Sequence, residues 1–343
     1  MRQNNFNFLR FYFAFIVVIG HLIGISKVEV FQKFAPYFNT YISVTAFFCI
    51  SGFLITRSYL NTPSFKEYLA KRAARLLPAY IFVVLTCAVF LSLTSRYSFD
   101  EYFAHPLFFK YLAANLSFLN FIQPSLPGVF LQDGLASPVN GALWTLKVEV
   151  SFYLLLPIIL FFVQKVKRKY ILFTGIYLFS IWYKYFFEEL SVNTGSRLYN
   201  MLSHQLPGFL YYFVSGIALY YYFEFFLRYK KWLLAFGIIT FLIEYKMGLE
   251  ILNPIALSII VFTFAFSLKQ LNLFAKHGDI SYGIYIFHCP IINLAIYFGL
   301  FERYNPFVVG FAVIVIILLI GYVSWHIIEK RFLKRSHSIR VVE

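Results

Sequence analysis

Charged residues are scarce in this sequence. Only 13% of its 343 residues are charged, whereas 60% are hydrophobic and 22% are aromatic. A soluble globular domain of ordinary composition has about 25% charged residues. The composition therefore excludes a typical soluble protein and predicts an all-α, polytopic integral membrane protein.

Cysteine is also scarce, and the three cysteines (Cys49, Cys87 and Cys289) all lie in apolar stretches with no Cys-x-x-Cys pair. We interpret them as small core residues and expect neither a disulfide framework nor a metal site. Phosphate-binding glycine loops, His-Glu-x-x-His zinc motifs and Gly-x-Ser-x-Gly elbows are absent too. These absences argue against an ATP-driven pump, a dehydrogenase, a zinc protease or a serine-elbow hydrolase.

Hydrophobic residues gather in ten ranges that we expect to be membrane-spanning helices. The 30 lysine and arginine residues fall mainly in alternate loops, and residues 329–343 form a basic tail. This pattern predicts that both termini are cytoplasmic, and it accounts for the net charge of +15 without nucleic-acid binding. No linker divides the chain, so we expect residues 1–343 to form one domain. The expected spans are 7–26, 38–56, 77–94, 142–163, 169–187, 206–226, 231–246, 251–268, 281–300 and 306–328.

Arg10 and His21 are eleven residues apart in the first apolar range. Eleven helical steps return to within about 20° of the starting direction and cover about 16 Å along the axis. The two side chains therefore share one helix face, with the arginine near a membrane surface and the imidazole deep in the bilayer. Ionisable groups at that depth usually face a cavity or a substrate path. The alternative is a snorkelling arginine and a histidine that is hydrogen-bonded between helices.

Two further arginines, Arg72 and Arg75, precede the third apolar range and are three residues apart, so they share a helix face. Two guanidinium groups in this arrangement suit a phosphate group, which they bind by charge-assisted hydrogen bonds. The alternative is a stop-transfer cluster that faces lipid head groups, which is the commoner role of such residues.

The second apolar range is interrupted by Ser51 and Gly52. A glycine inside an apolar helix permits close approach of a neighbouring helix or of an extended ligand. Helix packing is the commoner use, so it is the interpretation that we favour for Gly52.

Polar side chains also occur in the fourth and ninth ranges. Glu149 aligns with Tyr153 four residues later, whereas Lys147 points in a different direction. A carboxylate in this position could orient an imidazole, relay a proton or only satisfy a neighbour. The ninth range has three polar residues on one helix stripe: Ser281, Tyr285 and His288. That stripe serves either catalysis or interhelical packing.

Six segments, taken in order, resemble the membrane-bound acyltransferase 3 family, which includes many bacterial sugar and polysaccharide O-acetyltransferases. They are NFLRFYFAFIVVIGH, FFCISGFLI, KRAARLLPAY, LWTLKVEVSFYLLLP, SYGIYIFH and IEKRF. The resemblance implies acetyl-CoA from the cytoplasm as the acyl donor, and a stand-alone member without an SGNH domain. The sequence departs from the family pattern at Val150, where a second glutamate is usual, and at Lys147, where a small polar residue is usual.

The same resemblance gives roles to the residues singled out above. It implies that His21 and Glu149 are catalytic and that three arginines bind acetyl-CoA: Arg10, Arg72 and Arg75. Five further residues are candidates for supporting the site or contacting the acceptor: Lys147, Tyr153, Ser281, Tyr285 and His288. No metal is implied.

We therefore expect an O-acetyltransferase in the bacterial cytoplasmic (inner) membrane. Its expected acceptor is a hydroxyl of a cell-surface carbohydrate, such as O-antigen, capsular polysaccharide, exopolysaccharide or a lipid-linked precursor. The alternative is a proton-coupled transporter or flippase for a lipid-linked sugar, which would also place ionisable groups inside the membrane. The sequence does not determine the oligomeric state.

Overall fold

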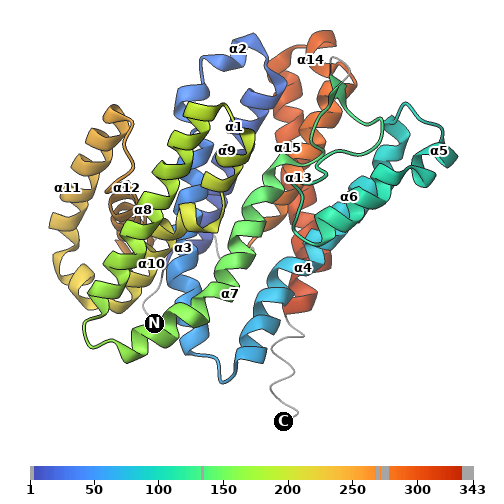
Figure 1. Cartoon of the computed structure of the whole chain (residues 1–343). Coiled ribbons are helices and arrows are strands. Elements are labelled where there is room, and N and C mark those ends of the chain that lie inside the picture. Colours follow the sequence, from blue (N-terminus) through green and yellow to red (C-terminus); the bar gives the residue numbers. More distant parts are fainter. Residues whose placement is uncertain (1–3, 133–134, 268–270, 272–277, 334–343) are drawn as a thin grey trace. The chain divides into compact units, whose positions relative to one another are not determined.

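The computed structural model describes residues 4–132, 135–267, 271 and 278–333 (Figure 1). Over these residues the regular secondary structure is helical, apart from two strands of two residues each. These strands, β1 (Leu131–Gln132) and β2 (Leu135–Ala136), pair in an antiparallel manner. The prediction of an all-α fold is confirmed.

A helix lies in each of the ten ranges that hydropathy singles out. Five helical stretches in the described part of the chain are long and apolar enough to cross a membrane, and they contain α1, α3, α4, α7 and α15. The number of crossings and the side on which the termini lie stay predictions. The ten helices are α1 (Phe6–Ser26), α3 (Thr40–Leu60), α4 (Phe65–Phe90), α7 (Trp144–Lys165), α8 (Lys169–Thr194), α10 (Leu210–Tyr221), α11 (Phe223–Met247), α12 (Asn253–Ser267), α13 (Ser281–Tyr297) and α15 (Pro306–Ser324).

Shorter helical elements connect the long ones, and local sequence signals fix their ends. The helix α5 begins with a capping box in which Ser98 and Glu101 bond each other's backbone amides. The helix α6 has Pro106 at its first position, where a missing N–H group costs nothing. The short helices are α2 (Glu29–Gln32), α5 (Phe99–Ala104), α6 (Pro106–Leu116), α9 (Arg197–Ser203) and α14 (Leu300–Arg303). The single turns are η1 (Ala35–Tyr37), η2 (Leu91–Thr94), η3 (Gly141–Leu143), η4 (Leu206–Phe209) and η6 (Trp325–Glu329).

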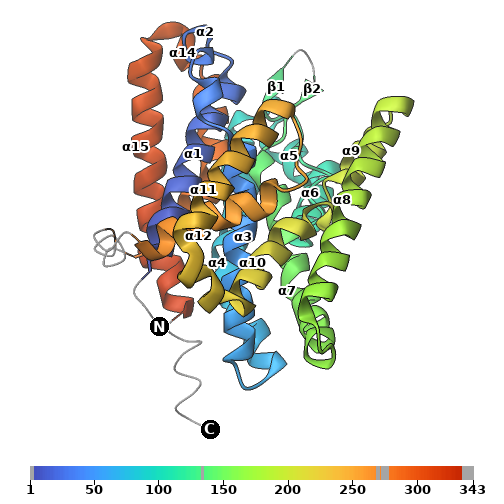
Figure 2. The same ribbon diagram turned by 90° about the vertical axis from the view of Figure 1, so that its left-hand side faces the viewer.

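The chain divides into two compact units. Unit 1 consists of Met1–Leu9, Tyr41–Tyr68 and Val148–Lys276, and unit 2 consists of Arg10–Thr40, Leu69–Lys147 and His277–Glu343. In unit 1, α11 and α12 lie side by side (Figure 1 and Figure 2). In unit 2, α13 packs along α15 (Figure 1).

Glycines permit the closest helix contacts in both units. In unit 1, a Cβ atom on Gly52 of α3 would overlap the carbonyl oxygen of Phe213 in α10, and one on Gly216 would overlap that of Cys49. Gly52 therefore serves helix packing, which is the interpretation that the sequence favoured over contact with an extended ligand. In unit 2, a Cβ atom on Gly283 of α13 would lie 2.9 Å from the Cα atom of Gly321 in α15.

A polar cluster around Lys184 lies within unit 1. Its Nζ atom forms an ion pair with Glu250 and donates hydrogen bonds to the hydroxyls of Tyr41 at 2.7 Å and Tyr211 at 3.1 Å. Those two hydroxyls donate in turn to Oε2 of Glu250, at 2.8 and 2.9 Å. The Glu250 carboxylate thus accepts from three donors. The ion pair and the hydrogen bonds together compensate for the burial of Lys184, whose side chain is only 9% exposed.

Replacement of Lys184 by methionine is expected to lower the free energy of unfolding by about 2 kcal/mol, since it leaves the Glu250 carboxylate without this ammonium group. The loss is smaller than the roughly 3–5 kcal/mol of a fully buried pair because the Glu250 side chain is 23% exposed. Thermal unfolding of the detergent-solubilised protein measures the change. The double variant Lys184→Met/Glu250→Gln should recover part of the loss, and an unchanged melting temperature in the single variant would contradict the prediction.

Candidate active site

The helix α1 carries Arg10 and His21 on one face, as their spacing predicts. It runs without interruption from Phe6 to Ser26, so the two residues are three turns apart. Both belong to unit 2, and so do the partners of their side chains described below.

His21 contacts a second histidine, His288 of α13. Its Nδ1 atom lies 2.6 Å from Nε2 of His288, and the two rings are stacked with centroids 4.9 Å apart. His288 is fully buried, and its Nδ1 atom donates to the carbonyl oxygen of Ile284 at 3.3 Å. Since Nδ1 of His288 carries the proton, its Nε2 accepts, and the shared proton belongs to Nδ1 of His21. This assignment leaves Nε2 of His21 with the lone pair of a base.

Cys289 adjoins the two imidazoles. Its Sγ atom lies 3.3 Å from Nε2 of His288 and 3.8 Å from Nδ1 of His21. Like Cys49 and Cys87, it is a buried free cysteine. The available sequence signal for this contact was the position of Cys289 directly after His288. The structure thus brings together a Cys/His cluster that was not predicted from the sequence.

Asp279 joins the two arginines of the candidate donor site. Its Oδ2 atom lies 3.0 Å from Nη1 of Arg10 and 2.7 Å from Nη2 of Arg75, and its Oδ1 atom accepts from the hydroxyl of Ser281. Burial raises the pKa of this carboxyl, but the two guanidinium groups and Ser281 outweigh burial and hold the pKa below its usual range. The half-buried Arg72 precedes Arg75 by one turn of α4. The arginines were predicted from the sequence, whereas the acid between them was not.

The Arg75 side chain is fixed from several directions. Its Nη1 atom lies 3.3 Å from Oε2 of Glu329, whose Oε1 atom accepts from the Ser324 hydroxyl at 3.1 Å. The rings of Trp325 and Tyr282 lie 5.6 and 5.8 Å from the guanidinium carbon. Cation–π contacts of this kind add to the two ion pairs. Arg75 is therefore held between two carboxylates.

Gly278 positions the Asp279 carboxylate. Its φ angle is +95°, a conformation that L side chains rarely adopt, and a Cβ atom there would overlap the indole of Trp325. Glycine therefore allows the chain to turn against Trp325 immediately before it enters α13.

The polar stripe predicted on α13 is present, but its members serve different contacts. Ser281 and His288 make the bonds described above, and the hydroxyl of Tyr285 lies 2.7 Å from that of Thr145. The stripe thus connects α13 to the preceding loop, to the start of α7 and to α1. Its two hydroxyl groups bond to Asp279 and Thr145, and its imidazole completes the histidine pair. The roles of Ser281, Tyr285 and His288 in the reaction stay predictions.

The polar residues of α7 have separate partners. Glu149 belongs to unit 1, where its Oε1 atom accepts from the hydroxyls of Tyr153 at 2.6 Å and Ser51 at 3.4 Å. Lys147 belongs to unit 2, where its Nζ atom lies 4.4 Å from the ring centroid of Phe121. The predicted alignment of Glu149 with Tyr153 is present, whereas the catalytic role of Glu149 stays a prediction.

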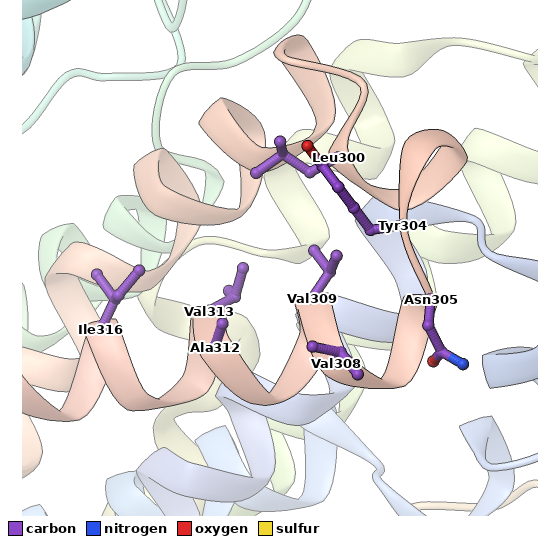
Figure 3. Close-up of a pocket in the computed structure, with 8 residues that line it drawn as sticks. All are labelled: Leu300, Tyr304, Asn305, Val308, Val309, Ala312, Val313 and Ile316. Atoms are coloured by element: carbon purple, nitrogen blue, oxygen red, sulfur yellow. The ribbon is translucent and has the colours of Figure 1, made fainter.

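An apolar groove of about 400 Å³ runs along α14 and α15 (Figure 3). None of the residues with candidate catalytic or donor-binding roles lines it. Its lining residues include no carboxylate, imidazole, thiol or basic side chain, so we do not place acyl transfer there. The lining residues are Leu300, Tyr304, Asn305, Val308, Val309, Ala312, Val313 and Ile316.

Comparison with known proteins finds relatives that match between 74% and 98% of the chain. The chain is 25% identical to an O-acetyl transferase of Shigella phage Sf6, over 98% of this chain and 97% of the relative. It is also 25% identical to nodulation protein 10 of Rhizobium leguminosarum bv. viciae, over 98% and 95%. It is 26% identical to the peptidoglycan O-acetyltransferase OatA of Listeria monocytogenes, over 74% of this chain and 45% of the relative. No solved structure matches the chain.

The acyltransferase domain family matches residues 3–326, which is nearly the whole chain. This range contains the histidine pair on α1 and α13 and the Asp279 carboxylate with its two arginines. It also contains most of the six segments that carry the resemblance described above. The chain belongs to the acyltransferase 3 family, and it is a membrane acyltransferase.

Proposed function

We propose that the protein transfers an acetyl group from cytoplasmic acetyl-CoA to a hydroxyl of a cell-surface carbohydrate, acting in the bacterial cytoplasmic membrane. The observation that carries the proposal is the contact between His21 and His288, which leaves a base on the helix that also carries Arg10. The O-acetyltransferase names of the phage and Listeria relatives support a hydroxyl as the acceptor. The peptidoglycan named for the Listeria protein supports a carbohydrate polymer.

The arginines suit the donor because CoA is a polyanion. Guanidinium groups bind phosphate through paired, charge-assisted hydrogen bonds. Asp279 holds Arg10 and Arg75 together, so that both can act on one anionic ligand without mutual repulsion. From Arg10, the helix α1 leads about 16 Å to His21. The extended phosphopantetheine arm follows this path and delivers the thioester to the imidazole.

The transfer then needs one base and one leaving group. Nε2 of His21 removes the proton of the acceptor hydroxyl as its oxygen attacks the thioester carbonyl. The new C–O bond forms, the C–S bond breaks, and the departing CoA thiolate takes the proton from the His21 imidazolium. His288 stabilises that imidazolium because its Nε2 atom accepts from Nδ1 of His21, the role that the aspartate carboxylate performs in a catalytic triad.

The test compares the O-acetyl content of total cell-surface glycan in intact, deleted and complemented cells, measured by mass spectrometry. Acetyl esters that disappear on deletion and return on complementation would support the proposal and identify the acceptor. A purified protein that neither binds acetyl-CoA nor releases CoA in the presence of that glycan would overturn it.

A further inference from the structure

We infer that His21, His288 and Cys289 form a binding site for a zinc ion, and that zinc bound there blocks acyl transfer. The three ligand atoms, Nδ1 of His21, Nε2 of His288 and Sγ of Cys289, all lie within 4.8 Å of one another. They come from two helices of the same unit. The binding stands on this geometry alone, whereas the inhibition rests on the proposed function.

The distances are close to those of a tetrahedral zinc site. Bond lengths of about 2.0 Å to nitrogen and 2.3 Å to sulfur place two ligand nitrogens about 3.3 Å apart and a nitrogen and a sulfur about 3.6 Å apart. The nitrogen–sulfur distances are 3.3 and 3.8 Å, and the nitrogen–nitrogen distance is 2.6 Å. The two imidazoles therefore need to separate by roughly 0.7 Å to admit the ion. His21 is the least buried of the three ligands, so we place this movement and the entry of the ion on its side.

The chemistry of the donor set also favours zinc. Two imidazoles and a thiolate with one open position suit a zinc ion, and they disfavour calcium and magnesium, which prefer oxygen ligands. The Ile284 carbonyl accepts from Nδ1 of His288, which already directs the Nε2 lone pair toward the ion.

Zinc binding and base catalysis require opposite tautomers of His21. On binding, the Cys289 thiol loses one proton to solvent as the Zn–S bond forms. Nδ1 of His21 must give up its proton to become a ligand, so the neutral ring carries that proton on Nε2 instead. Nε2 then has no lone pair with which to accept the proton of the hydroxyl. The bound ion would therefore prevent the reaction without touching the arginine cluster.

The binding is tested with Co²⁺, which substitutes for Zn²⁺ in its sites and absorbs visible light. Purified protein titrated with Co²⁺ is expected to bind one ion per chain, with tetrahedral ligand-field bands and a thiolate-to-cobalt charge-transfer band that Zn²⁺ removes. Cys289→Ser should lose the charge-transfer band. Cys49→Ser, which changes another buried free cysteine, should keep it. A wild-type spectrum that shows only hydrated octahedral cobalt would overturn the inference.

The inhibition is tested by acetyl transfer with increasing Zn²⁺. The wild type is expected to lose transfer and to regain it with a chelator. Cys289→Ser should need at least about 10-fold more zinc for the same loss, because the loss of even an outer-shell partner costs about 10–100-fold in metal affinity. Zinc that binds without slowing transfer would overturn the regulatory part. A wild-type protein with no transfer at all would count against the proposed function, and the cobalt spectrum would then decide on the site by itself.

Discussion

Replacement of His21 by alanine is expected to reduce acetyl transfer by about 10²–10⁴-fold, the usual contribution of a positioned general base. The variant keeps the arginine cluster around Asp279, so the KM for acetyl-CoA should change little while kcat falls. The measurement is release of CoA by purified protein in detergent, with the acceptor glycan present. The loss should persist at saturating acetyl-CoA, because the missing group acts on the hydroxyl and not on the donor.

His326→Ala is the matched control for this variant. His326 is also a histidine of unit 2, and its Nδ1 atom donates to the Tyr322 carbonyl of its own helical segment at 2.9 Å. We expect full transfer activity from this control, and near-identical melting temperatures for both variants would show that they fold. Wild-type activity in a folded His21→Ala protein would remove His21 from the reaction.

The sequence predicts well those parts of the site that depend on one helix. Once the segment is helical, the spacing of eleven residues places Arg10 and His21 on one helix face. The contact between Glu149 and Tyr153 follows from a separation of four residues in the same way. Such predictions need only the helical period, and the structure confirms both.

Contacts between distant segments could not be predicted in this manner. His21 and His288 are 267 positions apart, and Arg75 and Asp279 are 204 apart. No helical period relates such residues, so their meeting depends on how the helices pack. Asp279 also lies in a loop outside the apolar ranges, where a single carboxylate is no signal of a functional role.

Helix ends differ from the predicted spans for a physical reason. The helix α4 begins at Phe65 and α11 at Phe223, whereas the apolar ranges begin at 77 and 231. Hydropathy detects only the part of a helix that suits a lipid environment. Charged first turns continue the same backbone hydrogen bonds, so the helix extends beyond the apolar range into polar surroundings.

Replacement of Asp279 by asparagine is expected to lower the free energy of unfolding by about 3–5 kcal/mol, because it leaves two partly buried guanidinium groups without their shared carboxylate. It should also raise the KM for acetyl-CoA, since Arg10 and Arg75 would no longer be held together. Thermal unfolding and donor titration measure the two effects. Asp100→Asn, at an exposed acid of α5, is the control and should change neither.

The lowered pKa of Asp279 determines how its contribution to stability depends on pH. A carboxyl whose pKa falls on folding stabilises the protein above its unfolded value, which is near 3.8, and loses that effect as the pH falls through the folded value. The ionisation of Asp279 itself should therefore add no pH dependence to the destabilisation by Asp279→Asn above about pH 5.

The double variant Asp279→Asn/Arg10→Gln separates the two roles of the carboxylate. If Asp279 mainly relieves repulsion between the arginines, the second substitution restores stability but not the KM for acetyl-CoA, because the donor then lacks one of its cations. Recovery of both would show that Arg10 does not contribute to donor binding.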